Sequence, residues 1–570
     1  MSLTIRRAPI HVLNLRNLAN ALSYQWRGSL HGPRFGVRGK MVRNAGAPRR
    51  VAVDGDWRLA VLVLVAATLL RLVLAALVPL FPDEAYYWVW STRPAGGYYD
   101  HPPLIAFLIG IGGWSATPLG IRIGPVLAGF VLTLATAAIA RRIGGDRAAL
   151  RVAVIMSCVP LIAAGLILAS PDAPLLAAAA VGLYAVVRAI EHPGGARATL
   201  WWWVLAGVAL GLALCSKYTA FVLAGGGFLG LLSSKDLRQH LRTPGPWVAI
   251  MVALIVFLPV VAWNAEHSWA SFHFQFRHGL KPPKISGPIG VLRREGDYLG
   301  AMLGLASPVL FVLFVLATVR GLSQRATSAQ RLLAVVATVT VVFFAYSALR
   351  QRVEPNWPAP AYGPAIILLA TLPWSARAVR WTKAGVVLGG AMSLLICVHA
   401  IVPILPIRPS RDPIRRAAGW DAVAGAVERA RTDLSRSSTA HTWVAGNRYQ
   451  DAALLSFYDR GIHAFAVNIG GRRNQYDLWP GFNGLAAPGD RLVLILDDSP
   501  NIPVPIAALG PYFQSVRRGE RVAMRWRDDE VGNRRLWVLE GWKGGWPPRP
   551  HWAPPDRFRV THAAVGMSGQ

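Results

Sequence analysis

Carboxylates stand at the ends of long apolar runs in this 570-residue sequence. Asp83 and Glu84 directly follow the first run, and Asp172 lies in a proline-flanked turn, Pro171-Asp-Ala-Pro174. An ionisable group at the end of a membrane helix is costly unless it has a function. A carboxylate held there is suited to accept a proton from a reacting group. Asp83, Glu84 and Asp172 are therefore the candidate catalytic residues, although Asp172 could also serve only as a helix N-cap.

The first loop continues with aromatic residues, Tyr86-Tyr-Trp-Val-Trp90, and then with Tyr98-Tyr-Asp-His-Pro-Pro-Leu104. Amphipathic aromatic side chains prefer the headgroup level, so this segment predicts a short helix along the membrane interface, and anchoring alone would explain it. Asp100 and His101 could join the two preceding acids in a divalent-metal site. No spacing rule identifies such a site, and a hydrogen-bonding role within the loop is favoured for His101. We therefore assign no metal ligand and no cofactor.

Lys217 interrupts the apolar stretch 199–233, which is too long for one crossing and predicts a hairpin. A lysine there is costly unless it reaches the interface, where an anionic lipid headgroup would neutralise it; snorkelling alone is the alternative. Tyr218 beside it can donate a hydrogen bond. Further candidate substrate-binding residues are polar and lie in later outer loops, where a solvated basic loop is the alternative: Arg277, His278, Lys281, Arg350, Arg352, Glu354 and Asn356.

The composition indicates what class of protein this chain is. Hydrophobic residues make up 53% of the chain and charged residues only 16%, against about a quarter in soluble domains, so the chain is a membrane protein. The net charge of +31 is spread over many loops and not clustered on one soluble domain, which argues against nucleic-acid binding. All three cysteines fall in apolar segments and indicate neither disulfides nor zinc.

Apolar runs predict an α-helical polytopic domain with about eleven membrane spans, at most thirteen, between residues 58 and 405. The predicted spans are 59–80, 120–140, 149–169, 174–190, 199–215, 219–233, 246–263, 297–319, 331–348, 361–375 and 384–405. Arginine and lysine gather in alternate loops, which the positive-inside rule places in the cytoplasm together with the N-terminus. Most carboxylates of the membrane region then lie on the outer side.

Two regions flank this membrane domain. Residues 1–57 are basic and contain no signal peptide, and they predict a disordered cytoplasmic extension. Residues 406–570 alternate apolar and polar positions, which predicts a small outer α/β domain with strands at 442–446 and 491–496 and a helix at 451–458. This domain could cover the site or select the acceptor; a purely structural lid is the alternative.

Four motifs in order carry a family resemblance: the first-loop pattern 83–104, Ser170-Pro-Asp-Ala-Pro174, Ser216-Lys-Tyr-Thr-Ala220 and Val353-Glu-Pro-Asn-Trp357. Together they resemble the bacterial family-39 glycosyltransferases of the GT-C superfamily. That superfamily includes protein O-mannosyltransferases, the lipid A aminoarabinose transferase and the lipopolysaccharide-core galacturonic acid transferases. The tail is similar to the last branch, with Asn447-Arg-Tyr-Gln-Asp451 and Asn474-Gln-Tyr-Asp-Leu-Trp479.

The resemblance implies transfer of a sugar from a polyprenyl-phosphate carrier to a hydroxyl acceptor on the outer side of the membrane, with inversion. Asp83 matches the family's first-loop acid and is our choice for the base, with Glu84 as its competitor. Asp172 would bind sugar or acceptor hydroxyls or hold the base. Lys217, the best candidate for the carrier phosphate, would stabilise the leaving group with help from Tyr218.

The expected acceptor is a cell-envelope glycolipid, such as lipid A or lipopolysaccharide, or a polysaccharide, and the expected location is the bacterial inner membrane with a periplasmic site. Transfer to protein is the alternative within the class. A lipid-carrier transporter without chemistry is disfavoured because no internal repeat or paired helix interruption is found. A noncatalytic scaffold leaves Asp83, Asp172 and Lys217 unexplained. The sequence specifies neither the sugar, the acceptor nor the oligomeric state.

Overall fold

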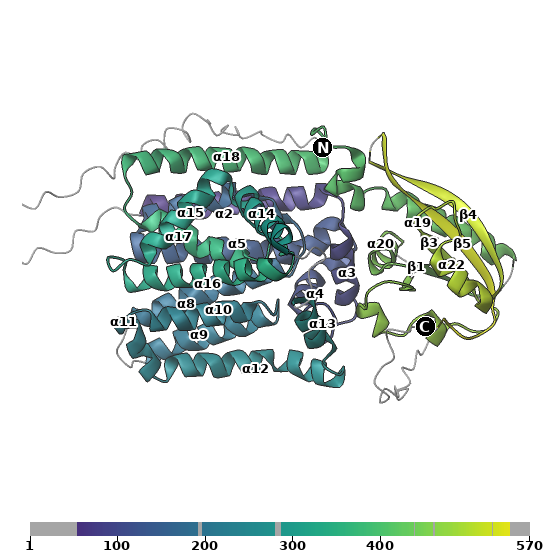
Figure 1. Cartoon of the computed structure of the whole chain (residues 1–570), viewed down its shortest axis with the longest axis horizontal. Helices are drawn as coiled ribbons and strands as arrows, with labels where there is room; N and C mark the ends of the chain where they lie inside the picture. Colours follow the sequence, from purple (N-terminus) through teal and green to yellow (C-terminus); the bar gives the residue numbers. More distant parts are fainter. Residues whose placement is uncertain are drawn as a thin grey trace, which may run out of the picture.

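The computed structural model describes residues 54–191, 197–279, 287–437, 439–459, 462–526 and 528–547. A bundle of helices ends at Ile401, and a small α/β domain follows it at one end of the bundle (Figure 1). The boundary lies close to the one expected at residue 406. The predicted basic extension falls outside the described residues up to position 53.

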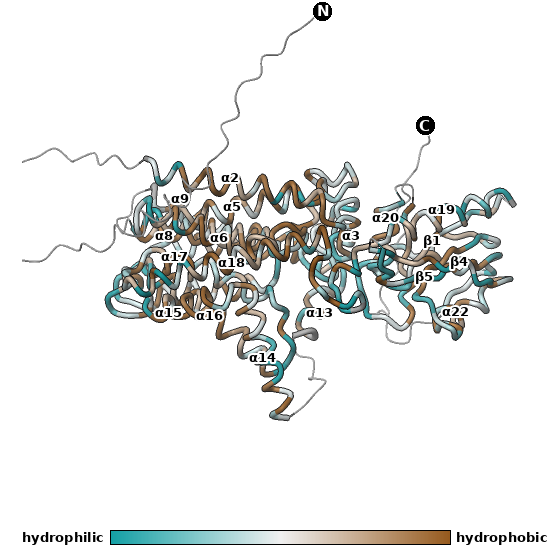
Figure 2. Tube along the Cα trace, turned by 90° about the horizontal axis from the view of Figure 1, so that it is seen from above, coloured by the Kyte–Doolittle hydropathy of each residue, from teal (hydrophilic) through white to brown (hydrophobic). Residues whose placement is uncertain are grey.

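Among the described residues, six helices are long and apolar enough to cross a membrane. They are α2 (Asp54–Leu77), α5 (Pro118–Gly144), α8 (Asp172–Ile190), α12 (Gly245–Glu266), α16 (Ser328–Arg350) and α18 (Ala376–Ile401). Figure 2 shows that the helices of the bundle are mostly hydrophobic along their length. Helices suit a bilayer because each backbone amide and carbonyl is satisfied within its own segment.

Three further apolar segments are bent helix pairs. The pairs are α6 (Asp146–Cys158) with 160–167, bent by 77°; α10 (Ala220–Leu232) with 235–242, bent by 113°; and α14 (Gly287–Ala306) with α15 (Pro308–Gly321), bent by 101°. The spans expected at 149–169 and 297–319 are therefore not single straight helices. Pro160 and Pro308 each start a new helix at the bend, because proline lacks the N–H that would continue the old one.

The number of spans stays a prediction. Counting each bent pair as one span gives up to nine, and two shorter apolar helices, α9 (Arg197–Leu214) and α17 (Tyr362–Thr371), add to these among the described residues.

Charge separates along the bundle. The short helix α11 (Lys235–Arg238) lies at the end opposite the α/β domain (Figure 1). Arg141 and Arg142 stand in the last turn of α5, whose first turn lies at the other end. The acidic first loop forms α3 (Pro82–Ser91) and α4 (Leu104–Gly110), next to the α/β domain. The positive-inside rule would place the basic end in the cytoplasm, and this orientation stays a prediction.

The outer domain is built on a five-stranded sheet in the order β2-β1-β3-β5-β4. The strands are β1 (Thr442–Gly446), β2 (Phe465–Ala466), β3 (Arg491–Leu496), β4 (Phe513–Trp526) and β5 (Asp529–Trp542). The strands predicted at 442–446 and 491–496 are confirmed, and the predicted helix is α20 (Tyr449–Tyr458). Parallel pairing of β1 with β2 and β3 places α20 on one face of the sheet, as in other βαβ connections.

Helix α3 joins the two parts of the molecule. Its Trp90 and Tyr86 are almost fully buried in a hydrophobic core that also contains Leu454 of α20. The ring of Trp88 meets the ring of Phe457 edge-on at 5.4 Å. The first-loop aromatic residues therefore do more than anchor the chain at the interface: they form the joint on which the outer domain rests.

Candidate active site

The Glu84 carboxylate is buried, and both of its oxygens accept hydrogen bonds from the protein. Its Oε1 accepts hydrogen bonds from Arg122 Nε at 2.7 Å and from the Ala169 amide at 2.8 Å. Its Oε2 accepts from Arg122 Nη2 at 2.5 Å and from the Phe81 amide at 3.0 Å. Arg122 also donates to the last carbonyls of α2 and the turn after it, those of Ala75, Val78 and Pro79. With both oxygens occupied, Glu84 is a poor competitor for the role of base.

Asp83 has the opposite environment. Its side chain is exposed, and it accepts no hydrogen bond from the part of the chain that the structure describes. Water reaches the carboxylate, yet protein surrounds it on most sides. This desolvation raises the pKa of Asp83, the negative charge of Asp100 adds to the rise, and Arg472 and Arg416 oppose it. A carboxyl group with a raised pKa is a stronger base once ionised, so the geometry favours Asp83 over Glu84.

Three of the sequence motifs meet at Asp172. Lys217 Nζ lies 2.8 Å from Asp172 Oδ1, and Asn356 Nδ2 donates to Asp172 Oδ2 at 2.5 Å. We call these three residues the bundle cluster. Asp172 is the first residue of α8, where Pro171 is the N-cap, and its carboxylate makes no side-chain cap. The N-cap alternative for Asp172 is therefore wrong.

Lys217 retains donors for a ligand. Its side chain is only 10% exposed, and an ammonium group has three N–H donors. Asp172 takes one of them, and no other described residue accepts a hydrogen bond from Nζ. A buried cation with unused donors beside a carboxylate can bind an anionic group such as a phosphate.

Asp100 connects the first loop to the outer domain. Its Oδ2 accepts from the Tyr86 hydroxyl at 2.7 Å, and its Oδ1 lies 2.5 Å from Arg472 Nη1. We call Asp83, Asp100 and Arg472 the joint cluster. Around it, the amide of Gln475 donates to the Tyr86 hydroxyl at 2.6 Å, which ties the loop 468–477 to α3.

Tyr87 lies between the two clusters. Burial raises the pKa of Tyr87 well above its usual value, and the negative charges of Asp83, Asp100 and Asp172 all raise it further. The carboxylates of both clusters therefore act electrostatically on the Tyr87 hydroxyl. The ring of His101 lies 6.1 Å from the Tyr87 ring. Among the described residues, no three His, Cys, Asp or Glu side chains group closely enough to hold a metal ion.

The remaining predicted binding residues lie outside these contacts. Tyr218 shares a 2.8 Å hydrogen bond with Ser271, so its hydroxyl is bonded away from the bundle cluster. Arg350 donates to the Tyr346 hydroxyl. Arg352 and Glu354 form a loose, exposed pair at 3.9 Å. Lys281 and the side chains of Arg277 and His278 lie outside the described residues. Their roles in substrate binding stay predictions.

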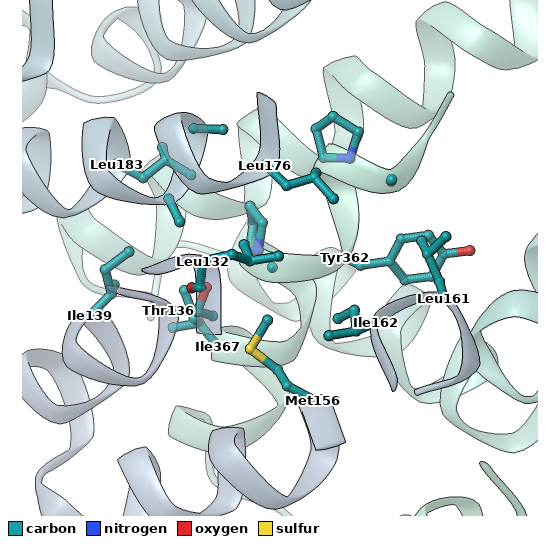
Figure 3. Close-up of a pocket in the computed structure, with 16 residues that line it drawn as sticks. Leu132, Thr136, Ile139, Met156, Leu161, Ile162, Leu176, Leu183, Tyr362 and Ile367 are labelled. Carbon is teal, nitrogen blue, oxygen red and sulfur yellow. The ribbon is translucent and has the colours of Figure 1, made fainter. Parts of the chain in front are cut away.

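An apolar cavity of about 20 Å³ lies inside the bundle (Figure 3). Leu176, one turn after Asp172, and Leu183 line one side of it, and Tyr362 lines another. No carboxylate, amine or imidazole is among its lining residues. The candidate chemistry therefore belongs to the polar clusters at the outer end of the bundle and not to this cavity.

Three residues of these contacts were missed from the sequence. Arg122 sits inside an apolar helix and gives no motif signal. Tyr449 and Arg472 belong to the outer domain, where Tyr449 lies within the pattern Asn447-Arg-Tyr-Gln-Asp451 and Arg472 just before Asn474-Gln-Tyr. Those two patterns were the available signal, but no reasoning from spacing connects them to residues more than 340 positions earlier.

Known proteins resemble this chain in sequence and in fold. A sequence model of the family described as dolichyl-phosphate-mannose-protein mannosyltransferase matches residues 100–263. The lipid A galacturonosyltransferase RgtD of Rhizobium johnstonii is 26% identical over 344 residues, which cover 59% of this chain and 69% of that protein. The crystal structure of ArnT from Cupriavidus metallidurans bound to undecaprenyl phosphate has a TM-score of 0.58 at 16% identity, covering 86% of this chain and 99% of that one.

These matches support a membrane glycosyltransferase, and the chain has the GT-C fold. The structure of ArnT in its apo state matches with a TM-score of 0.57 at 17% identity, so the shared GT-C fold does not depend on one bound state. The family match includes Asp100, Asp172 and Lys217, but it begins after Asp83 and ends before Asn356. The structure brings residues from inside and outside the matched region of this GT-C glycosyltransferase into the same two clusters.

Proposed function

We propose that this GT-C glycosyltransferase moves a sugar from a polyprenyl-phosphate carrier to a hydroxyl group of a lipid A-type glycolipid. The carrier is proposed because ArnT, which has the same fold, binds undecaprenyl phosphate. The acceptor is proposed because RgtD acts on lipid A. The proposal rests on two residues at the same end of the bundle. Asp83 is an exposed carboxylate without a hydrogen bond from the described residues, and Lys217 is a buried lysine with unused donors.

The two residues divide the chemistry. The acceptor oxygen attacks the anomeric carbon, and Asp83 takes the proton that this oxygen loses. The bond between the anomeric carbon and the phosphate oxygen breaks, and the lipid phosphate leaves as an anion, which Lys217 stabilises. Attack opposite the leaving group inverts the anomeric centre. Asp172 holds Lys217 in place, and Asn356 holds Asp172, so the cation keeps its position through the reaction.

Reconstituted transfer tests the proposal. Purified enzyme in lipid nanodiscs is given a synthetic polyprenyl-phosphate sugar with either lipid A or an acceptor peptide, and products are read by mass spectrometry. We expect a glycosylated lipid A of inverted anomeric configuration. A modified peptide with unmodified lipid A would favour the protein acceptor, to which the mannosyltransferase family description points. Binding of the carrier without any transfer would favour a lipid-carrier transporter.

The proposed location is the bacterial inner membrane, with the outer domain in the periplasm. Alkaline phosphatase fused after Leu405 should be active, because it folds to its active form only on the outer side. Activity confined to a fusion after Arg242, in the basic region around α11, would reverse the orientation and contradict the site assignment.

A further inference from the structure

Arg472 is the side chain through which the outer domain reaches the first-loop acids. Its Nη1 donates to Asp100 Oδ1 at 2.5 Å and to the Arg473 carbonyl at 3.1 Å. Its Nη2 donates to the Tyr449 hydroxyl at 2.9 Å. The guanidinium also lies over the rings of Tyr449 and Phe274, at 4.9 and 5.2 Å from their centroids. It is therefore held in one orientation by groups from the first loop, α13 (Ala270–Gly279) and the outer domain.

Two N–H donors of this guanidinium have no partner among the described residues. Arginine carries five N–H donors, and three of them are used by Asp100, the Arg473 carbonyl and Tyr449. The Nε–H and the second Nη2–H remain, and no described residue accepts a hydrogen bond from either. Unused guanidinium N–H donors of this kind can bind the oxygens of a carboxylate or phosphate. The side chain is 43% exposed, so a ligand can reach these donors.

Arg416 adds a second cation. Its guanidinium is exposed and makes no ion pair or hydrogen bond within the described residues, while its carbonyl accepts from Trp420 Nε1 at 3.1 Å. The charges of Arg416 and Arg472 both act on Asp83. A proton acceptor has no need of two cations, which only weaken it as a base.

We propose that Arg472 forms an anion subsite near Asp83, to which the charge of Arg416 contributes, and that this subsite binds a carboxylate or phosphate group of a substrate. The inference rests on the proposed function and adds a determinant of substrate choice to it. Lys217 is reserved for the carrier phosphate, so the anion comes from one of two other sources. It is either the carboxylate of a uronic acid on the donor or a phosphate on the glycolipid acceptor.

Four substrate pairs distinguish the two sources. The purified full-length enzyme is given a polyprenyl-phosphate uronic acid or the matching neutral hexose, each with a glycolipid acceptor that carries or lacks phosphate. For wild-type enzyme and for Arg472→Gln and Arg416→Gln, kcat/KM is measured on each pair. The control is Arg436→Gln, because Arg436 is 76% exposed and, within the described ranges, pairs only with its helix neighbour Asp433.

If the subsite binds the sugar, Arg472→Gln should reduce the preference for the uronic acid over the neutral hexose by roughly tenfold to a hundredfold, the value of a charged hydrogen bond. If it binds the acceptor, the same loss should appear in the preference for the phosphorylated glycolipid. Arg416→Gln should shift the same ratio by less, and Arg436→Gln should shift neither. An equal loss on all four pairs, or unchanged ratios, would overturn the subsite.

Two further measurements keep the inference testable if Arg472→Gln fails to fold or the proposed function fails. Arg472→Lys keeps a positive charge near Asp100 but loses the guanidinium fork, so the ratio should fall while the protein stays folded. Labelling of wild-type Arg472 by phenylglyoxal should be slowed by free uronic acid or by inorganic phosphate and not by a neutral sugar. No protection by either anion would overturn the subsite, whereas protection without any transfer activity would contradict the proposed function alone.

Discussion

The bundle cluster and the joint cluster hold the same kinds of groups but are built differently. In the bundle cluster, Asp172, Lys217 and Asn356 all come from the membrane domain, and each is paired with another. In the joint cluster, Asp83 accepts no hydrogen bond from a described residue, and Asp100 is paired with an arginine of the outer domain. The membrane domain therefore holds the Lys217 cation in place by itself. The surroundings of Asp83, the proposed base, are complete only when the outer domain is docked.

The same contrast appears within one turn of α3. Glu84 is buried with an arginine and two amides, and its neighbour Asp83 is exposed. Adjacent residues on a helix point about 100° apart, so one faces the bundle and the other faces away from it. Position on the helix, and not residue type, leaves Glu84 paired and Asp83 exposed.

The largest effect is expected at the unpaired acid. Asp83→Asn keeps the shape of the side chain but removes the proton acceptor, so kcat should fall by about 10²–10⁴. Binding of the donor should be unchanged. Single-turnover transfer from a polyprenyl-phosphate sugar measures the chemical step directly. A rate equal to that of the wild type would remove Asp83 from the mechanism.

A smaller loss is expected at the bundle cluster. Lys217→Met should reduce turnover by about 10²–10³, because it removes a charge aimed at the leaving group. It also leaves Asp172 buried and unpaired, which lowers stability. The double variant Lys217→Met, Asp172→Asn should recover the melting temperature but not the activity. Recovery of both would mean that Lys217 serves only to neutralise Asp172.

The pH profile sharpens the comparison. Asp83 must be ionised to act as a base, and desolvation together with Asp100 raises its pKa, so activity should be lost as pH falls through a value above that of an ordinary aspartate. Arg472 lowers the pKa of Asp83, so Arg472→Gln should move this acidic limb to higher pH. Lys217→Met should leave the limb in place. If the acidic limb of the pH–activity profile does not move in Arg472→Gln, then Arg472 does not influence the pKa of Asp83.

The smallest effect on turnover is expected at Glu84. Glu84→Gln keeps the shape of the side chain, but its amide nitrogen cannot accept the two hydrogen bonds that one carboxylate oxygen takes. It also leaves Arg122 as an uncompensated buried charge, which costs about 3–5 kcal/mol of stability. The melting temperature should therefore fall, while turnover of the folded enzyme should be reduced far less than in Asp83→Asn. A stable but inactive Glu84→Gln enzyme would move the base by one residue.

Much of the bundle could be predicted from the sequence. Apolar runs located the helices because the requirement for internal backbone hydrogen bonding leaves a membrane segment few alternatives. The bends before Pro160 and Pro308 were missed because hydropathy averages over a window and carries no direction. In the outer domain, β1, β3 and α20 were predicted because buried strands and helices show their periodicity locally.

The sequence by itself determined which residues have a high desolvation cost. Asp83, Glu84, Asp172 and Lys217 stand at membrane helix ends, where a charged side chain loses water and needs a function or a partner to offset that loss. Tertiary structure decided which of them has a partner. Arg122 lies 38 positions from Glu84, and Arg472 lies 372 positions from Asp100. Ion pairing depends on distance in space, which chain spacing does not specify. Only the packed joint therefore separates the structural acid from the one left free to react.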